Sequence, residues 1–165
     1  MLLLLLSFLF LLILSAIFSG SEIAYFNKRS KQDDVKKIIP LFNDSKKLLI
    51  SLLTGNTFIN ISLASIATLF TISLVDTLGL NQYYLIFLQI FVVSILILIF
   101  GEIIPKIIAM RDSEYFAKRT HLIIKLLAKI FYPIALIFYT ITNWILVILP
   151  INKEKIFDTE EELKI

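Results

Sequence analysis

Four long stretches without a charged residue constrain the fold of this 165-residue chain more than any other feature. They cover residues 2–18, 48–75, 83–100 and 130–149. About 20 apolar residues in an α-helix are enough to cross the hydrocarbon core of a bilayer. The sequence therefore predicts an all-α membrane protein. Its expected membrane helices lie at about 2–26, 48–75 and 83–104.

The composition excludes several classes of function. Hydrophobic residues make up 58% of the chain, which is well above the usual share in a water-soluble domain. The chain has no cysteine, so a disulfide framework and a thiolate metal site are both excluded. His121 is the single histidine, which removes the usual zinc sites and histidine-based catalytic arrangements. We therefore expect that the protein is not an enzyme.

The basic residues are confined to three segments between or after the apolar runs. Of the 16 Lys and Arg residues, seven lie in 28–47, six in 106–129 and three in 153–164. This distribution is typical of the positive-inside rule and not of a nucleic-acid-binding surface. It predicts a multi-pass protein of the plasma membrane, with its N-terminus outside and its C-terminus in the cytoplasm. Whether 130–149 forms a fourth span stays open, although Pro133 favours a hairpin.

Glu102 is a carboxylate at the end of an apolar run. An ionised carboxylate at the centre of a membrane helix costs about 2.5–3.5 kcal/mol. Pro105 has no N–H, so the carbonyl of Gly101 loses its α-helical donor. A carboxylate and a freed carbonyl at adjacent positions predict a pair of hard oxygen ligands for a cation. The alternative is an interface position at which Glu102 pairs with Lys106, one helical turn away.

The first two helices supply neutral oxygen groups. Ser15 and Ser19 are four residues apart, as are Asn56 and Asn60, so each pair shares one helix face. Such residues also serve as packing contacts between membrane helices. A set of oxygen groups with one carboxylate suits Mg²⁺, Ca²⁺ or Na⁺ and not zinc or copper. Later hydroxyls of the second run are interpreted as packing positions: Ser62, Ser65 and Thr68.

Three segments together resemble the signature segments of one family. They are residues 15–24 (SAIFSGSEIA), 55–60 (GNTFIN) and 101–106 (GEIIPK). In order and spacing they are similar to the transmembrane domain of the CorC/CNNM (cyclin M) magnesium transporters, and the resemblance covers essentially the whole chain. It implies three transmembrane helices, a cytoplasmic-side juxtamembrane helical hairpin or belt at about 112–149, and a homodimer in the lipid bilayer. The Mg²⁺ ligands that it implies are Ser15, Ser19, Asn56, Gly101 and Glu102, with Asn60 as a less certain addition.

The same resemblance implies a function. Residues 1–150 are expected to form a domain that exports Mg²⁺ across the plasma membrane, and Na⁺ is the candidate coupling ion. A Mg²⁺-sensing regulator and a structural membrane anchor remain alternatives. Residues 151–165 are expected to begin an acidic cytosolic helical linker, with Thr159 and Glu162 as a capping box. In the family such a linker leads to nucleotide-binding CBS modules, which this sequence does not contain.

Overall fold

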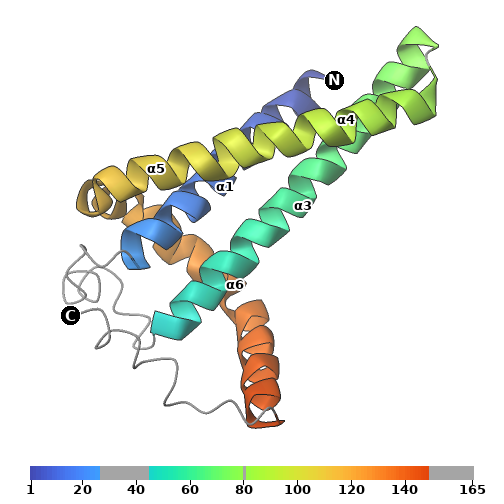
Figure 1. Ribbon diagram of the computed structural model, residues 1–165. Helices are drawn as coiled ribbons and strands as arrows, with labels where there is room; N and C mark the ends of the chain where they lie inside the picture. The colour runs from blue at the N-terminus through green and yellow to red at the C-terminus, as the bar shows by residue number, and fades with distance from the viewer. Residues whose placement is uncertain (27–44, 80, 149–165) are drawn as a thin grey trace, which may run out of the picture.

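The computed structural model describes residues 1–26, 45–79 and 81–148, and these residues are almost entirely helical (Figure 1). The all-α fold class is confirmed. The described elements are α1 (Leu2–Phe26), α3 (Ser45–Leu78), α4 (Gln82–Leu96), the π-helix η1 (Ile97–Ile103), α5 (Ile104–Arg111) and α6 (Ser113–Ile148). The expected linker with its capping box at Thr159 and Glu162 lies outside these residues.

Four helical stretches in the described part of the chain are long and apolar enough to cross a membrane. They are Leu2–Phe26, Lys47–Leu78, Gln82–Arg111 and Ser113–Ile145. This makes the chain a multi-pass membrane protein. The expectation of three such helices was one too few by length and composition, since the amphipathic segment after Arg111 joins the last apolar run in one helix.

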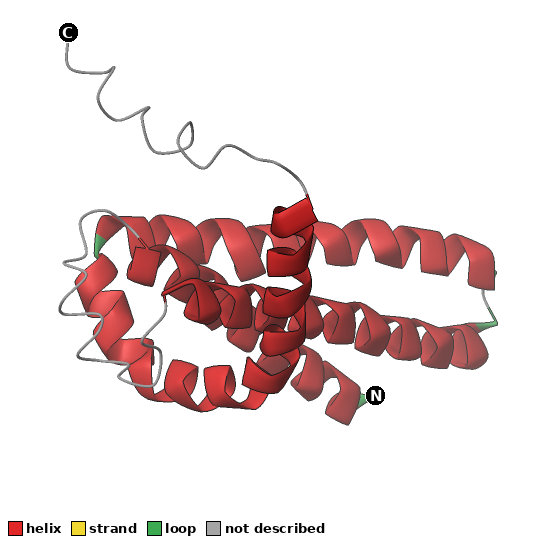
Figure 2. Ribbon diagram, turned by 90° about the horizontal axis from the view of Figure 1, so that it is seen from below, coloured by secondary structure: helices red, strands yellow, loops and turns green. Residues whose placement is uncertain are grey.

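The sequence predicted a juxtamembrane helical hairpin or belt at about 112–149, and the prediction of a hairpin is wrong. Residues 113–148 form the single helix α6, which contains Pro133 and does not turn back on itself. Its axis instead changes direction part-way along, as both ribbon views show (Figures 1 and 2). A proline inside a helix removes one hydrogen bond and clashes with the preceding turn, which bends the helix without necessarily ending it.

The third apolar helix continues beyond its expected end at residue 104. Asn81 starts it, because its side-chain oxygen accepts hydrogen bonds from the N–H groups of Tyr83 and Tyr84 at 3.0 and 3.4 Å. Within this continuous helical stretch, Gln82–Arg111, η1 adopts the wider π-helical pattern. The N–H of Ile104 donates to the carbonyl of Ile99, five residues earlier. Single π-helical turns inside α-helices occur frequently at functional sites.

Helix α1 lies at the centre of the packing and contacts α3, η1, α5 and α6. Phe18 of α1 is fully buried and meets the ring of Phe131 edge-on, with ring centroids 5.8 Å apart. Gly55 of α3 faces the same side chain: a Cβ there would lie 2.4 Å from Phe18 Cε1. Glycine is therefore required at position 55 for α1 and α3 to approach so closely.

Helix α6 uses one face to dock on α1 and α3. Its buried residues recur every three or four positions, as an amphipathic helix requires: Ala117, Thr120, Ile124, Ala128, Phe131 and Ala135. The Thr120 hydroxyl lies 3.2 Å from the Ser21 hydroxyl of α1. A Cβ on Gly20 would lie 2.3 Å from Cζ of Phe116, so this ring would have to move if position 20 carried a side chain.

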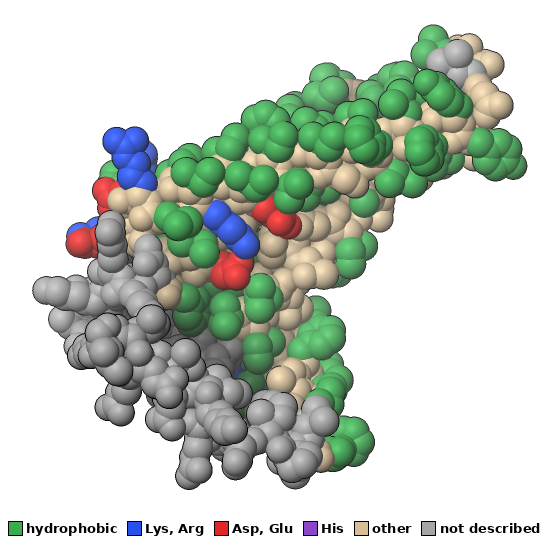
Figure 3. All heavy atoms as spheres, in the orientation of Figure 1, with side chains coloured by type: hydrophobic (Ala, Val, Ile, Leu, Met, Phe, Trp, Pro, Cys, Tyr) green, Lys and Arg blue, Asp and Glu red, His purple; other side chains and the backbone are tan. Residues whose placement is uncertain are grey.

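Large apolar side chains cover the outward faces of the helices (Figure 3). Leu2, Leu3 and Phe87 are each about three-quarters exposed, and Tyr83 is 85% exposed. A soluble monomer rarely shows so continuous an apolar surface. The visible charged side chains lie on the half of the molecule that holds α5, and none is visible toward the turn between α3 and α4 (Figure 3). The surface is therefore that of a helix bundle whose sides contact lipid.

Candidate functional site between the membrane helices

A polar cluster joins α1, α3 and η1 within the apolar bundle. The buried Ser15 hydroxyl of α1 donates to Asn60 Oδ1 of α3 at 2.7 Å and lies 3.3 Å from Asn56 Oδ1. Asn60 Nδ2 in turn donates to Glu102 Oε1 of η1 at 3.0 Å. Four of the six residues singled out from the sequence thus form one hydrogen-bonded chain across three helices.

Gly101 brings its backbone against the same cluster. It is buried, and a Cβ built on it would lie 2.8 Å from the Ser15 hydroxyl oxygen and 3.5 Å from Ser15 Cβ. Any side chain at this position would displace the hydroxyl. The absence of a side chain therefore lets α1 and η1 approach at the level of the cluster.

Ser19 lies one helical turn beyond Ser15 on α1. Its hydroxyl is fully buried and has no hydrogen-bond partner among the described residues. A buried hydroxyl without a partner is costly, and a bound water or ion is one explanation for such a group. Its position next to a chain of oxygen groups makes it a candidate ligand.

Several hydroxyls of α3 behave differently from Ser15 and Ser19. These hydroxyl groups donate to the carbonyl four residues earlier in their own helix, a common arrangement for Ser and Thr in membrane helices. This group includes the three residues interpreted as packing positions: Ser62, Ser65 and Thr68. Ser65 is exposed and the other two are only partly buried, so their hydroxyls mainly satisfy their own helix.

The structure pairs Lys106 with Glu22 and not with Glu102, which the interface interpretation had required. Lys106 Nζ lies 3.3 Å from Glu22 Oε2 on α1. The carboxylate of Glu102 is half-buried and accepts a hydrogen bond from the neutral amide of Asn60. Glu102 therefore supplies the one negative charge of the polar cluster.

Pro105 is the second residue of α5, just after the π-helical segment, and it is buried. Because it has no N–H, it cannot donate to the Gly101 carbonyl in the α-helical pattern. The change from π-helix to α-helix also falls between Gly101 and Pro105. Irregular backbone at membrane depth is tolerated where it faces protein or a cavity, and helix breaks of this kind supply carbonyl ligands to ions.

The described residues contain no group of three or more acidic, histidine or cysteine side chains that could hold a metal. A cation between these helices would rely on neutral oxygens and on the carboxylate of Glu102. Such a donor set fits a hard cation. It also fits reversible binding, because one carboxylate balances only part of a divalent charge.

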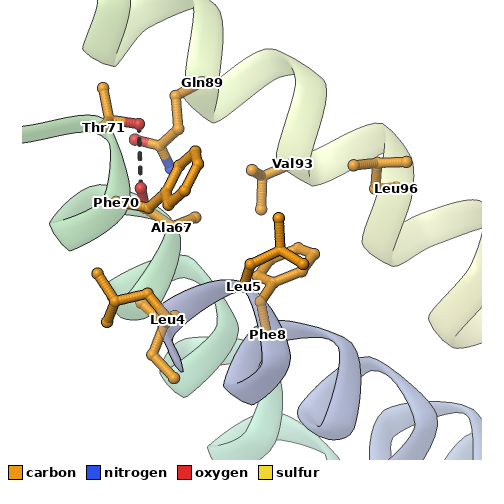
Figure 4. A pocket seen from close by; sticks show the side chains of 10 residues that line it. Leu4, Leu5, Phe8, Ala67, Phe70, Thr71, Gln89, Val93 and Leu96 are labelled. Carbon is orange, nitrogen blue, oxygen red and sulfur yellow. Dashed lines mark hydrogen bonds between the residues drawn. The ribbon is translucent and has the colours of Figure 1, made fainter. Parts of the chain in front are cut away.

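A cavity of about 200 Å³ lies between α1, α3 and α4 (Figure 4). Its lining is almost entirely apolar, with Thr71 and Gln89 as the polar exceptions. Phe8 and Ala67 of the lining each lie seven residues from the nearest cluster residue of their helix, Ser15 and Asn60. At 1.5 Å per residue, the cavity lies about 10–12 Å from the polar cluster, toward the N-terminus of α1.

Sequence reasoning missed two features of the site. The first is the π-helix, which no residue propensity predicts. Only the Gly-Glu-x-x-Pro spacing indicated that the regular α-helical hydrogen bonding is interrupted there. The second is the division of the segment around Ser19: Ser15 belongs to the polar cluster, whereas Gly20 and Ser21 dock α6. The four-residue spacing of Ser15 and Ser19 indicated the face of α1 that meets the polar cluster. No signal in the sequence marked the face of α1 on which α6 docks.

The fold and the cluster define a multi-pass α-helical membrane domain with an oxygen-lined polar site between its helices. The chain belongs to the family of the cyclin M transmembrane N-terminal domain, whose family model matches residues 6–165. It is also 29% identical to a UPF0053 protein of Haemophilus influenzae. That match covers 93% of this chain but 38% of the relative, so the chain spans well under half the length of the curated relative it matches.

Proposed function

We propose that this domain binds Mg²⁺ in the polar cluster and transports it across the plasma membrane. The observation that carries the proposal is the half-buried carboxylate of Glu102 on η1, which is linked through Asn60 of α3 to the buried Ser15 hydroxyl of α1, inside a bundle whose sides are apolar. Membership in the cyclin M family, which is linked to ion transport, supports the same function. Ionisable groups at membrane depth commonly mark ion pathways.

The proposed ligands divide by charge. Glu102 is the anionic ligand, and Gly101 provides its backbone carbonyl. Four neutral side chains supply the remaining candidate oxygens: Ser15, Ser19, Asn56 and Asn60. The coordination geometry of the ion decides which of them bind it. Mg²⁺ favours six oxygens in near-octahedral geometry at about 2.0–2.1 Å, and water molecules can complete such a shell.

The proposed mechanism is alternating access. The ion would be held between the helices while the site opens to one side of the membrane at a time. In the described conformation the side toward the N-terminus of α1 is lined by the apolar cavity, which a hydrated cation would enter only at high cost. The opposite side carries the charged pair of Glu22 and Lys106. This asymmetry favours access from the Lys106 side, which the basic residues assign to the cytoplasm.

Export, Na⁺ coupling and a homodimer complete the proposal, and all three rest on the family resemblance. The domain would take up Mg²⁺ from the cytoplasmic side and release it outside, with CBS modules of a longer chain acting on it from the cytoplasm. The lipid bilayer is its second partner. No nucleic acid is involved.

Thermal unfolding separates an ion-binding domain from a structural anchor, whereas a Mg²⁺ sensor is separated from a transporter only by a measurement of ion flux. Purified protein in detergent is unfolded thermally with and without Mg²⁺, at matched ionic strength because the basic segments respond to salt. A ligand that binds only the folded state raises the melting temperature. We expect a Mg²⁺-dependent rise in the unaltered protein, its loss in Glu102→Gln, and its retention in Glu114→Gln, which changes an exposed carboxylate paired with Lys118. Equal rises in all three proteins would refute the site.

A further inference from the structure

An ion pair links α1 to α5 next to the polar cluster. Lys106 Nζ lies 3.3 Å from Glu22 Oε2, and the two side chains are 36% and 23% exposed. Glu22 follows Ser19 by three residues on α1. Lys106 follows Glu102 by four residues on the third apolar helix. The pair is therefore placed about one helical turn from the proposed ion ligands on both helices.

Lys106 has two carboxylates within its range. Glu102 precedes it by four residues, which is the favourable order and spacing for a glutamate–lysine pair on one helix. The structure nevertheless pairs Lys106 with Glu22 across the helix interface, while Glu102 accepts from Asn60. The long, flexible lysine side chain makes either partner accessible. The position of the ammonium group therefore depends on Glu22.

We propose that Glu22 is a positioning residue that holds Lys106 away from Glu102 and so keeps the Glu102 carboxylate available to the cation. The inference rests on the proposed function, because it assigns a role to Glu22 only if Glu102 binds an ion. Glu22 need not touch the ion itself.

The physical consequence of losing Glu22 is specific. Without its partner, the Lys106 ammonium pairs with Glu102 and competes with the cation for the one anionic ligand. The ammonium also brings a positive charge to within a few ångströms of a divalent ion, in a site that is only partly hydrated. Partly exposed ion pairs are worth up to about 1 kcal/mol, which corresponds to about a fivefold change in affinity.

The test is a double-mutant cycle in the purified full chain, read as the Mg²⁺ concentration that gives half of the maximal rise in melting temperature. Glu22→Gln should raise this concentration about fivefold. Lys106→Gln should leave it unchanged or lower it. The variant with both substitutions should return to the unaltered value or below, because the competing ammonium is gone.

A purely structural ion pair gives a different pattern. There both single variants weaken Mg²⁺ binding alike, and the double variant does not recover; either result overturns the proposal. Lys106→Gln alone keeps the test decisive if Glu22→Gln fails to fold, since weaker Mg²⁺ binding in that variant contradicts the proposal. Failure of the proposed function is distinguishable, because the unaltered protein then shows no Mg²⁺-dependent rise at all.

Discussion

Gly101→Ala is the substitution that probes the geometry of the cluster most finely. The added Cβ would lie 2.8 Å from the Ser15 hydroxyl oxygen, about 0.6 Å closer than an ordinary contact. The Ser15 side chain must rotate or shift, and in doing so it loses its 2.7 Å hydrogen bond to Asn60. A hydrogen bond of this kind contributes about 0.5–1.5 kcal/mol to stability, and an off-rotamer side chain costs about as much.

Helix propensity opposes these costs. Alanine is favoured over glycine by up to about 1 kcal/mol in a helix interior. The free energy of unfolding should therefore fall by only about 0–2 kcal/mol. Mg²⁺ affinity should fall by about tenfold or more, because the substitution moves a ligand and crowds the neighbouring carbonyl.

The assay is the Mg²⁺ titration of the melting temperature, repeated in a Ser15→Ala background. Ser15 Cβ would lie 3.5 Å from the new Cβ, so without the hydroxyl the alanine fits at ordinary contact distance. Gly101→Ala should therefore cost little or be stabilising there. Gly55→Ala is the control, since its Cβ clashes with Phe18 and not with the cluster; it should lower stability while Mg²⁺ dependence remains. An unchanged Mg²⁺ titration in Gly101→Ala would refute the reasoning.

Two further predictions concern the third helix and the topology. Pro105→Ala restores an N–H that can donate to the Gly101 carbonyl, so Mg²⁺ affinity should fall while thermal stability stays equal or rises; unchanged affinity would show that this carbonyl is not a ligand. Since the chain has no native cysteine, Asp76→Cys should react with a membrane-impermeant maleimide on intact cells, whereas Lys125→Cys should react only after permeabilisation. Labelling in the reverse order would invert the proposed orientation.

Much of the fold could be predicted from charge and hydropathy alone. Uncharged runs long enough to cross the hydrocarbon core have few alternatives to membrane helices, because backbone groups in lipid must be satisfied within the segment. The spacing of Ser15 to Ser19 and of Asn56 to Asn60 by four residues gave the helix faces. The structure then brings Ser15 and both asparagines together with Glu102.

What could not be predicted depends on tertiary contacts. Local spacing favours a pair between Glu102 and Lys106, but packing of α1 against α5 offers Glu22 instead. Pro133 locally indicates a break, yet the helix bends and continues because its apolar face remains packed on α1 and α3. The π-helical turn at Gly101 likewise has no sequence period of its own.

The central claim is that the cluster passes Mg²⁺ across the membrane, and ion flux tests it most directly. The full chain is reconstituted into liposomes that contain a Mg²⁺-sensitive dye, and Mg²⁺ is added outside in the absence of any other protein. The account predicts dye-reported influx with the unaltered protein and with Glu114→Gln, and none above empty liposomes with Glu102→Gln. Equal influx with Glu102→Gln, or Mg²⁺ binding without any flux in the unaltered protein, would contradict it.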